Sequence, residues 1–272
     1  MKKTFYLGID IGGTEIRGIL LDSSKNQRFL VFNIVTPRNK KSFLSALNEE
    51  INGLTQKKKI IGIGVGLPGI VDVKRGILAK APNLPFLNGW QAKKFFSKFK
   101  TSPVTHPDGR YGARVKIDND SRCFLRGEAF LGAGKNYKNI VALTIGTGIG
   151  GGLMINDKIY YGSHNSAGEF GHMIIGDKKS FERLGAKKAF LKMGDTSKII
   201  GLGIADLINA LDPQIVILGG GGIFTGGIQM ETVRRTARKY IMSPLAKKAS
   251  IIKGKLGENA QAIGAALLFK AR

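Results

Sequence analysis

The sequence has very little cysteine. Cys123 is the single cysteine among 272 residues, so no disulfide can form within the chain, and a zinc site made of several thiolates is excluded. A chain without disulfides fits a reducing compartment, and we expect a cytoplasmic location.

A long uninterrupted apolar run is also missing. The stretch "MKKTFYLGIDIGGTEI" begins with two lysines, as signal peptides do, but Asp10 and Glu15 interrupt it and no small-residue cleavage site follows. Residues 139–155 carry no formal charge, yet five glycines and two threonines make them a poor membrane span. We therefore expect a β-strand near the N-terminus and no membrane segment.

Acidic residues are scarce relative to basic ones. The chain has 19 Asp and Glu against 43 Lys and Arg, a formal net charge of +24. Such a charge attracts polyanions, and nucleic acid, polyphosphate and nucleotides are candidates. A solvated basic surface without a particular partner accounts for it equally well, because the lysines are scattered. Charge alone therefore assigns no function.

Apolar patterning predicts a first lobe with the order β-β-β-α-β. The predicted strands are residues 4–11, 16–22 and 27–35, and the predicted helix lies within residues 39–59. Residues 60–72 predict a buried strand that runs into a turn formed by glycine and proline. Short turns join the first three strands into an antiparallel meander. A strand that follows a helix indicates a parallel crossover.

The pattern partly recurs from residue 139, which predicts a second, similar lobe. A helix is expected at about 196–211, a strand over "QIVILGGGG", and a final helix over 258–272. Residues 101–116 have turn-forming residues without periodicity and predict a loop. The predicted lobes are residues 1–117, completed by 258–272, and residues 118–257.

Three glycine-rich turns could hold phosphate groups: "DIGGT" (10–14), "TIGTGIGGG" (144–152) and "ILGGGG" (217–222). Backbone N–H groups without a neighbouring side chain can approach phosphate oxygens, the Thr14 hydroxyl adds a donor, and Asp10 can hold hydrated Mg²⁺. Plain hairpin turns and helix-packing glycines are the structural alternatives. Neither a Walker motif nor a dinucleotide fingerprint is present.

The segment "IDNDS" has polar side chains where a predicted strand meets a helix. A carboxylate there can accept a proton from an alcohol nucleophile while a neighbouring amide holds an adjacent hydroxyl. The alternative is that Asp118, Asn119 or Asp120 only caps the helix. Together with phosphate turns and Mg²⁺, a base of this kind predicts phosphoryl transfer.

These motifs together resemble the ROK family, whose members are bacterial sugar kinases and related repressors. The resemblance rests on motifs that occur in the family's order: "LGIDIGGTEIRG", "GVGLPGIVD", "APNLPFLNGW", "IDNDS", "LTIGTGIGGGLMINDKIYYG", "SAGEFGHM" and "LDPQIVILGGG". It implies an α/β, two-lobed actin-like ATPase (ribonuclease H-like) fold with the active site in the interlobe cleft. It also implies a cytoplasmic protein that binds ATP, Mg²⁺ and a hexose, commonly as a homodimer.

The resemblance also implies roles for individual residues. Asp120 is similar to the family's catalytic base, which deprotonates the sugar 6-hydroxyl as it attacks the γ-phosphate. The residues that would hold the sugar are Gly69, Asn83, Asn119, Asp120, Glu169, His172 and Glu182. The residues that would hold ATP and Mg²⁺ are Asp10, Gly12, Gly13, Thr14, Gly146, Thr147, Gly148, Gly220 and Gly221.

The chain departs from the family at its zinc site. In typical members the histidine of "GEFGH" binds zinc with three cysteines of a "CxCGxxGCxE" run, whereas "MIIGDKKSFE" stands here without cysteine. We expect no structural zinc, and we expect packing of the shortened loop to orient His172 and Glu182. A solvated acid at a helix start and a hydrogen-bonded core histidine are the alternatives for these two residues.

An ATP-dependent hexose kinase, most simply a glucokinase, is the function that the resemblance favours. A polyphosphate-dependent glucokinase is an alternative, because zinc-free members include such enzymes and share a basic residue at Arg17, although "SAGEFGH" is typical of ATP users. Fructokinase, mannose kinase, N-acetylmannosamine kinase and N-acetylglucosamine kinase are further alternatives, since they share much of the sugar-binding set.

A sugar-sensing transcription regulator is the alternative from another class. The first predicted strand begins at about Thr4, which leaves no room for a helix-turn-helix, and we expect no specific nucleic-acid partner. In the loop 101–114, His106, Arg110 and Arg114 either reach the phosphoryl donor or lie on the surface.

Overall fold

The chain forms two compact units, each built on a five-stranded mixed sheet. The computed structural model describes residues 3–24, 26–99, 101, 114–176 and 178–270. One unit extends to Gly127 and is completed by residues 261–270; the other is Glu128–Ala260. The sequence placed these divisions after residues 117 and 257.

The first unit has the predicted order of three strands, a helix and a strand. Its sheet is arranged β3-β2-β1-β4-β7, in which β1, β2 and β3 are antiparallel and β4 and β7 run parallel to β1. The bounds are β1 (Phe5–Ile11), β2 (Glu15–Asp22), β3 (Arg28–Val35), α1 (Lys40–Lys57), β4 (Ile60–Leu67) and β7 (Val115–Asn119). Smaller elements lie between β4 and β7: β5 (Ile70–Asp72), β6 (Ile77–Lys80), a 3-10 helix (Pro85–Leu87) and α2 (Ala92–Phe96).

The turn predicted within residues 60–72 is present: β4 ends at Leu67, Gly69 has φ +82°, and β5 pairs with β6 in a separate hairpin. The end of the predicted loop was wrong. Residues 115 and 116 belong to β7 and not to a loop, because they pair with Ile63 and Gly64 of β4. Most of the predicted loop, residues 102–113, lies outside the described residues, and so do His106 and Arg110.

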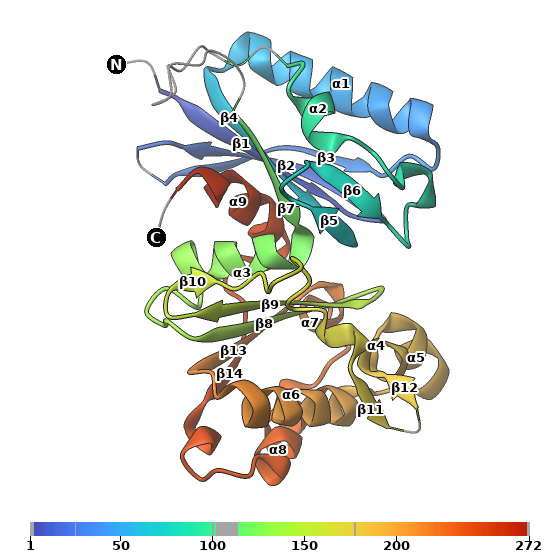
Figure 1. Cartoon of the computed structure of the whole chain (residues 1–272), viewed down its shortest axis with the longest axis vertical. Coiled ribbons are helices and arrows are strands. Elements are labelled where there is room, and N and C mark those ends of the chain that lie inside the picture. Colours follow the sequence, from blue (N-terminus) through green and yellow to red (C-terminus); the bar gives the residue numbers. More distant parts are fainter. Residues whose placement is uncertain (1–2, 25, 100, 102–113, 177, 271–272) are drawn as a thin grey trace. The chain divides into compact units, whose positions relative to one another are not determined.

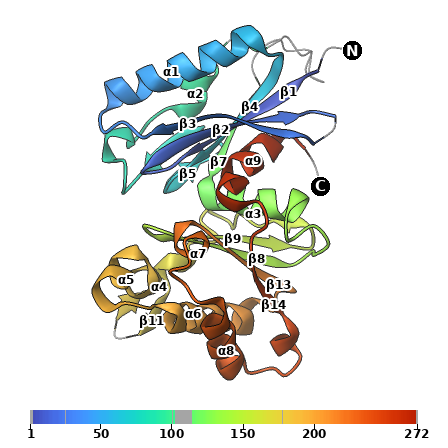
Figure 2. The same ribbon diagram turned by 180° about the vertical axis from the view of Figure 1, so that it is seen from behind.

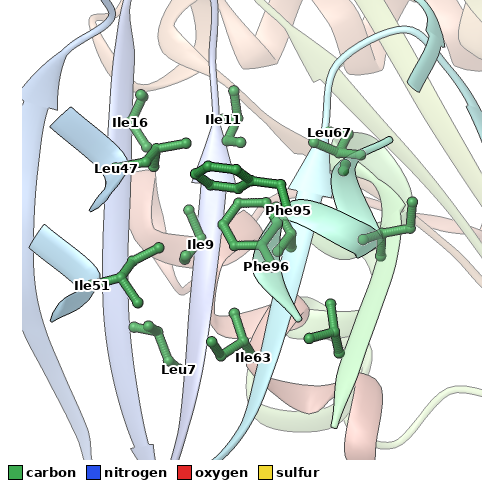
Figure 3. Close-up of a cluster of buried hydrophobic side chains, with 14 of the residues drawn as sticks. Leu7, Ile9, Ile11, Ile16, Leu47, Ile51, Ile63, Leu67, Phe95 and Phe96 are labelled. Atoms are coloured by element: carbon green, nitrogen blue, oxygen red, sulfur yellow. The ribbon is translucent and has the colours of Figure 1, made fainter. Parts of the chain in front are cut away.

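Helices cover both faces of the first sheet (Figures 1 and 2). On one face α1 buries Phe43, Leu47 and Ile51, which is the apolar stripe of an amphipathic helix. Figure 3 shows Leu47 and Ile51 facing the side chains of β1 and β4, with Phe95 and Phe96 of α2 beside them. Helices α1 and α2 therefore bury this face of the sheet.

The other face of this sheet packs against the last helix through glycines. A Cβ at Gly8 or Gly64 would lie 2.0 Å or 1.9 Å from a carbonyl oxygen of the helix. The predicted final helix is divided into a 3-10 helix (Gly257–Asn259), α9 (Ala260–Ala266) and a second 3-10 helix (Leu267–Phe269). Helix and sheet backbones thus approach closely here, which only glycine allows.

The second unit has the sheet order β10-β9-β8-β13-β14. Its strands are β8 (Ile140–Ile145), β9 (Ile149–Ile155), β10 (Lys158–Ile159), β13 (Ile215–Gly219) and β14 (Ser250–Lys253). Helices α6 (Ser197–Leu211) and α8 (Met230–Tyr240) lie side by side and share a core with the sheet (Figure 1). Helix α3 (Asp120–Leu131) begins in the first unit and ends in the second.

The second unit also contains shorter elements. They are two 3-10 helices (Phe170–His172 and Ala246–Lys248), β11 (Ile174–Gly176), β12 (Lys179–Ser180), α4 (Phe181–Gly185), α5 (Lys187–Met193) and α7 (Gly221–Phe224). No helix among the described residues combines the length and apolar character of a membrane span.

Candidate functional site

The first glycine turn, Gly12 to Thr14, joins β1 to β2 and is held by the chain after β3. The Thr36 N–H donates to the Thr14 carbonyl at 2.8 Å, the Thr36 hydroxyl to the Gly12 carbonyl at 2.8 Å, and the Arg38 guanidinium to the Gly13 carbonyl at 3.0 Å. The three carbonyl oxygens of the turn are therefore occupied. The Gly12 N–H donates to the Glu15 carbonyl at 2.9 Å, so an incoming anion meets the N–H groups of Gly13 and Thr14 and the exposed Thr14 hydroxyl.

Asp10 lies on β1 immediately before this turn, between Arg17 of β2 and Gly66 of β4. Burial raises the pKa of its carboxyl group from 3.8 to about 8; the nearby Asp120 carboxylate raises it as well, and Arg17 lowers it. Two neighbouring carboxylates suit a divalent cation, and Mg²⁺ prefers oxygen ligands while keeping several waters. Asp10 therefore fits the predicted role in holding hydrated Mg²⁺.

Asn119 and Asp120 stand where β7 ends and α3 begins. The Asn119 Oδ1 accepts hydrogen bonds from the N–H groups of Ser121 at 3.0 Å and Arg122 at 3.2 Å, so Asn119 caps α3. Its Nδ2 donates to the Gly69 carbonyl at 3.1 Å. Capping and ligand binding are compatible, because the second Nδ2 hydrogen remains for a sugar hydroxyl.

A buried ion pair that sequence reasoning missed supports this junction. Asp118 is fully buried, and its Oδ1 accepts hydrogen bonds from Arg122 Nε at 2.7 Å and from the Asn119 N–H at 2.8 Å. A second arginine, Arg126, lies 3.6 Å from the Asp118 Oδ2. Asp118 lies on β7 and Arg122 in the first turn of α3, so the pair is made by the junction of strand and helix.

The remaining sugar-binding candidates of the first unit lie near these two groups. Gly69 receives the Asn119 hydrogen bond, and a Cβ there would lie 2.3 Å from the Lys80 carbonyl oxygen. Asn83 is exposed, and its Cβ lies 3.3 Å from the position of a Cβ on Gly13. The structure thus brings Asn83 to the first glycine turn and Gly69 to the Asn119 side chain.

The second glycine turn, residues 146–148, joins β8 to β9 and is closed by a hydrogen bond from the Gly146 N–H to the Gly148 carbonyl at 2.9 Å. Thr147 at its tip is exposed. Gly220, with φ +87°, lies against the base of the turn, because a Cβ there would be 2.5 Å from the Ile145 carbonyl oxygen. Gly221 follows at the start of α7 with open space around it.

Glu182 contacts the second turn directly. Its Oε2 accepts the Ile149 N–H at 2.8 Å, and it is half-buried rather than fully solvated. Ser180 caps α4, in which Glu182 lies, by accepting the Arg183 N–H at 3.3 Å. The alternative of a freely solvated acid at a helix start therefore does not describe Glu182.

Glu169 is the N-cap of the 3-10 helix Phe170–His172, and His172 is the last residue of that helix. Their side chains are 48% and 74% exposed, and Glu169 Oε2 lies 4.0 Å from His172 Nε2. The histidine is therefore not a core residue. Phe170 packs on Gly151 beneath them, so the backbone of this segment is anchored while both polar groups stay open to a ligand.

The residues present do not fit a zinc site of the family's type. Cys123, the single cysteine, lies in the first unit, whereas His172 lies in the second. Among the described residues no group of three or more His, Cys, Asp and Glu side chains is arranged to hold a metal ion. In place of a cysteine loop, β11 and β12 form a hairpin that leads into the buried Phe181.

The sequence patterns above did not predict the roles of Thr36 and Arg38, although the strand register offers a signal. The antiparallel register pairs Glu15 with Val35, so the residues after Val35 must lie beside the turn before Glu15.

Arg114, one of the three loop candidates, lies over the Phe269 ring at 5.7 Å.

Comparison with known families agrees with the motifs. The model of the ROK family matches residues 6–185 and 181–272. A glucokinase of Thermotoga maritima is 26% identical over 100% of this chain and 99% of its own length. A xylose repressor of Bacillus subtilis is 27% identical over 97% of this chain and 76% of its own length.

Solved structures share the fold. A ROK family glucokinase from Streptomyces griseus in complex with glucose and AMPPNP has a TM-score of 0.82 at 23% identity, covering 97% of this chain and 98% of its own. An inorganic polyphosphate/ATP-glucomannokinase from an Arthrobacter strain has a TM-score of 0.72 at 23% identity, covering 97% of both chains. The fold is therefore the two-lobed α/β fold of these proteins, the actin-like ATPase fold.

Proposed function

The chain belongs to the ROK family, and on this basis we propose that it is a hexose kinase that transfers the γ-phosphate of ATP to the sugar 6-hydroxyl, with glucose as the expected sugar. The observation that carries the proposal is the junction of β7 and α3. There Asp120 follows an asparagine whose amide is fixed at both its oxygen and its nitrogen. A kinase needs such a base beside a hydroxyl-binding group.

Asp120 has the role of general base in this proposal. It accepts the proton of the 6-hydroxyl while that oxygen attacks the γ-phosphorus, and the bond from phosphorus to the β-phosphate oxygen breaks to give a hexose 6-phosphate and ADP. In the first unit the proposed sugar-binding groups are Asn119, Asn83 and the Gly69 segment. In the second unit they are Glu169, His172 and Glu182.

The glycine turns hold the donor. The N–H groups of Gly13 and Thr14 and those of Thr147 and Gly148 would bind phosphate oxygens, and Gly220 and Gly221 would lie by the adenosine. Asp10 would hold Mg²⁺, which neutralises phosphate charge when bound.

Replacement of Asp120 by asparagine tests the base. The amide keeps the size of the side chain but cannot take the proton, so kcat should fall by about 10²–10⁴-fold while the KM for glucose changes little. The measurement is a coupled assay of glucose 6-phosphate formation from ATP. Asp206→Asn, which changes an exposed aspartate of α6, is the matched control. An unchanged kcat for Asp120→Asn refutes the assignment.

The donor and the sugar are settled by one matrix of assays. Glucose, fructose, mannose, N-acetylmannosamine and N-acetylglucosamine are each offered with ATP and with polyphosphate. Polyphosphate is a specific alternative because of the charge of +24. Turnover with no pair of substrates, together with sugar-dependent and sequence-selective DNA binding, would favour a regulator related to the repressors instead.

A further inference from the structure

The second glycine turn is tied on both sides to the segment that begins at α4. On one side the Glu182 Oε2 accepts the Ile149 N–H at 2.8 Å. On the other side the Lys187 N–H, at the start of α5, donates to the Gly146 carbonyl at 2.9 Å. The conformation of the turn therefore depends on the position of this segment.

Glu182 and Gly148 are sterically matched. A Cβ at Gly148 would lie 2.3 Å from the Glu182 Oε2 and 3.1 Å from its Cδ. The carboxylate thus occupies the space that a side chain at residue 148 would need. Because no ordinary Cβ tolerates so short a contact, only glycine lets Glu182 reach the Ile149 N–H.

The backbone at Glu182 is fixed by packing, and one oxygen of the Glu182 carboxylate is available to a ligand. Phe181 is fully buried, and its ring lies 2.5 Å from the position of a Cβ on Gly203. The Glu182 Oε1 makes no hydrogen bond within the described part of the chain, while Oε2 is engaged. A carboxylate can accept at both oxygens, so a ligand hydroxyl can bind Oε1 without displacing the Ile149 N–H.

We propose that Glu182 is a positioning residue for the phosphoryl donor. A sugar bound to Glu182 fixes the conformation of the second glycine turn. A sugar hydroxyl on Oε1 fixes the carboxylate, the fixed Oε2 holds the Ile149 N–H, and the turn 146–148 keeps the conformation that receives donor phosphates. The inference rests on the proposed function, since it places sugar and donor at this unit. Its consequence is reciprocal: sugar raises donor affinity and donor raises sugar affinity by the same factor.

The coupling is measured with glucose and AMPPNP. Titration calorimetry gives the AMPPNP affinity with and without saturating glucose, and we expect glucose to raise it about tenfold in the unaltered protein. Glu182→Ala should abolish that factor. Glu182→Gln keeps an oxygen for the Ile149 N–H, so without glucose it should retain more AMPPNP affinity than Glu182→Ala.

Gly148→Ala tests the steric match from the opposite side. The added methyl group displaces the Glu182 carboxylate, so glucose affinity should fall about tenfold although residue 148 offers the sugar no polar group. Gly146→Ala should lower glucose affinity less, because a Cβ at Gly146 meets nothing within 4 Å. In a Glu182→Ala background the Gly148→Ala change should have little further effect, since the two changes act on one contact.

The outcomes separate this inference from the proposed function. If the protein binds both ligands and Glu182→Ala leaves the coupling factor intact, the inference is wrong while the kinase proposal stands. If glucose does not bind at all, the kinase proposal fails for glucose, and hydrogen exchange of the Ile149 amide decides the positioning role. That amide should exchange faster in Glu182→Ala than in Arg183→Ala, an exposed neighbour; equal rates overturn the inference.

Discussion

At the scale of single residues, the carboxyl groups of Asp118 and Asp10 in the first unit are buried, and the protein accommodates their charges in different ways. Asp118 is neutralised by Arg122 and Arg126. Asp10 has Arg17 on one side and Asp120 on the other, and burial dominates, so its pKa rises to about 8. A divalent cation bound beside Asp10 would lower its pKa, so the carboxyl group would lose its proton when the cation binds.

The raised pKa of Asp10 predicts how stability depends on pH in the absence of ligands. Below pH 3.8 the group is protonated in both the folded and the unfolded protein, and its contribution to stability is fully present. As pH rises from 3.8 through about 8, the unfolded chain loses the proton first, so the free energy of unfolding falls by up to about 1.4 kcal/mol per pH unit.

Urea unfolding between pH 5 and pH 8 measures this slope. Asp10→Asn should reduce the decline by that amount, because an amide does not titrate, whereas Asp206→Asn on the exposed face of α6 should keep it. Equal slopes in the unaltered protein and in Asp10→Asn contradict the prediction.

At the scale of elements, glycines decide which helices and strands can touch. A Cβ at Gly264 of α9 would lie 1.7 Å from the Cys123 carbonyl oxygen in α3, closer than at Gly8 or Gly64 of the sheet. In α1, by contrast, a Cβ at Gly53 meets nothing within 4 Å. Close packing therefore requires glycine at residue 264 of α9, whereas no steric contact requires glycine at residue 53 of α1.

Two alanine substitutions should have opposite effects on stability. Gly264→Ala forces α3 and α9 apart and should lower the free energy of unfolding by about 2 kcal/mol or more. Gly53→Ala, in the interior of α1, should leave stability unchanged or raise it by about 0.5–1 kcal/mol, because alanine is the better helix former. Urea unfolding of both variants checks this. A stability loss of equal size in both variants would mean that close packing is not the cause.

At the scale of the whole molecule, the chain pairs a family fold with an unusual charge. The net charge of +24 attracts any polyanion over a distance that salt controls, with a screening length of about 10 Å at 0.1 M salt and about 3 Å at 1 M. Glucose carries no charge and is unaffected by this field.

The charge predicts different salt dependences for the substrates. Raising salt from 0.05 M to 0.5 M should raise the KM for polyphosphate at least tenfold and the KM for ATP less, while the KM for glucose stays constant. Initial rates at several salt concentrations provide the measurement. A salt-independent KM for polyphosphate would show that local contacts, not the net charge, govern its binding.

The local sequence determined the order of the main secondary-structure elements, the site motifs and the family. Periodicity predicted the β-β-β-α-β order of the first unit, since buried strands and an amphipathic helix carry their own patterns. Motifs alone predicted Asp120, the glycine turns and the family, because their chemistry lies in consecutive residues. Glycine and proline predicted the turn after Leu67, but the local pattern did not show that β5 leaves the main sheet to pair with β6.

Only the tertiary structure decided which distant residues meet. Thr36 and Arg38 hold the first turn because β3 pairs with β2, and Glu182 reaches Ile149 because Gly148 leaves it room. The pKa of Asp10 depends on Asp120, which is far away in sequence and begins α3 directly after β7, the strand beside β4. Hydrogen bonds, steric exclusion and electrostatic repulsion act over a few ångströms in space, and residue spacing along the chain does not encode them.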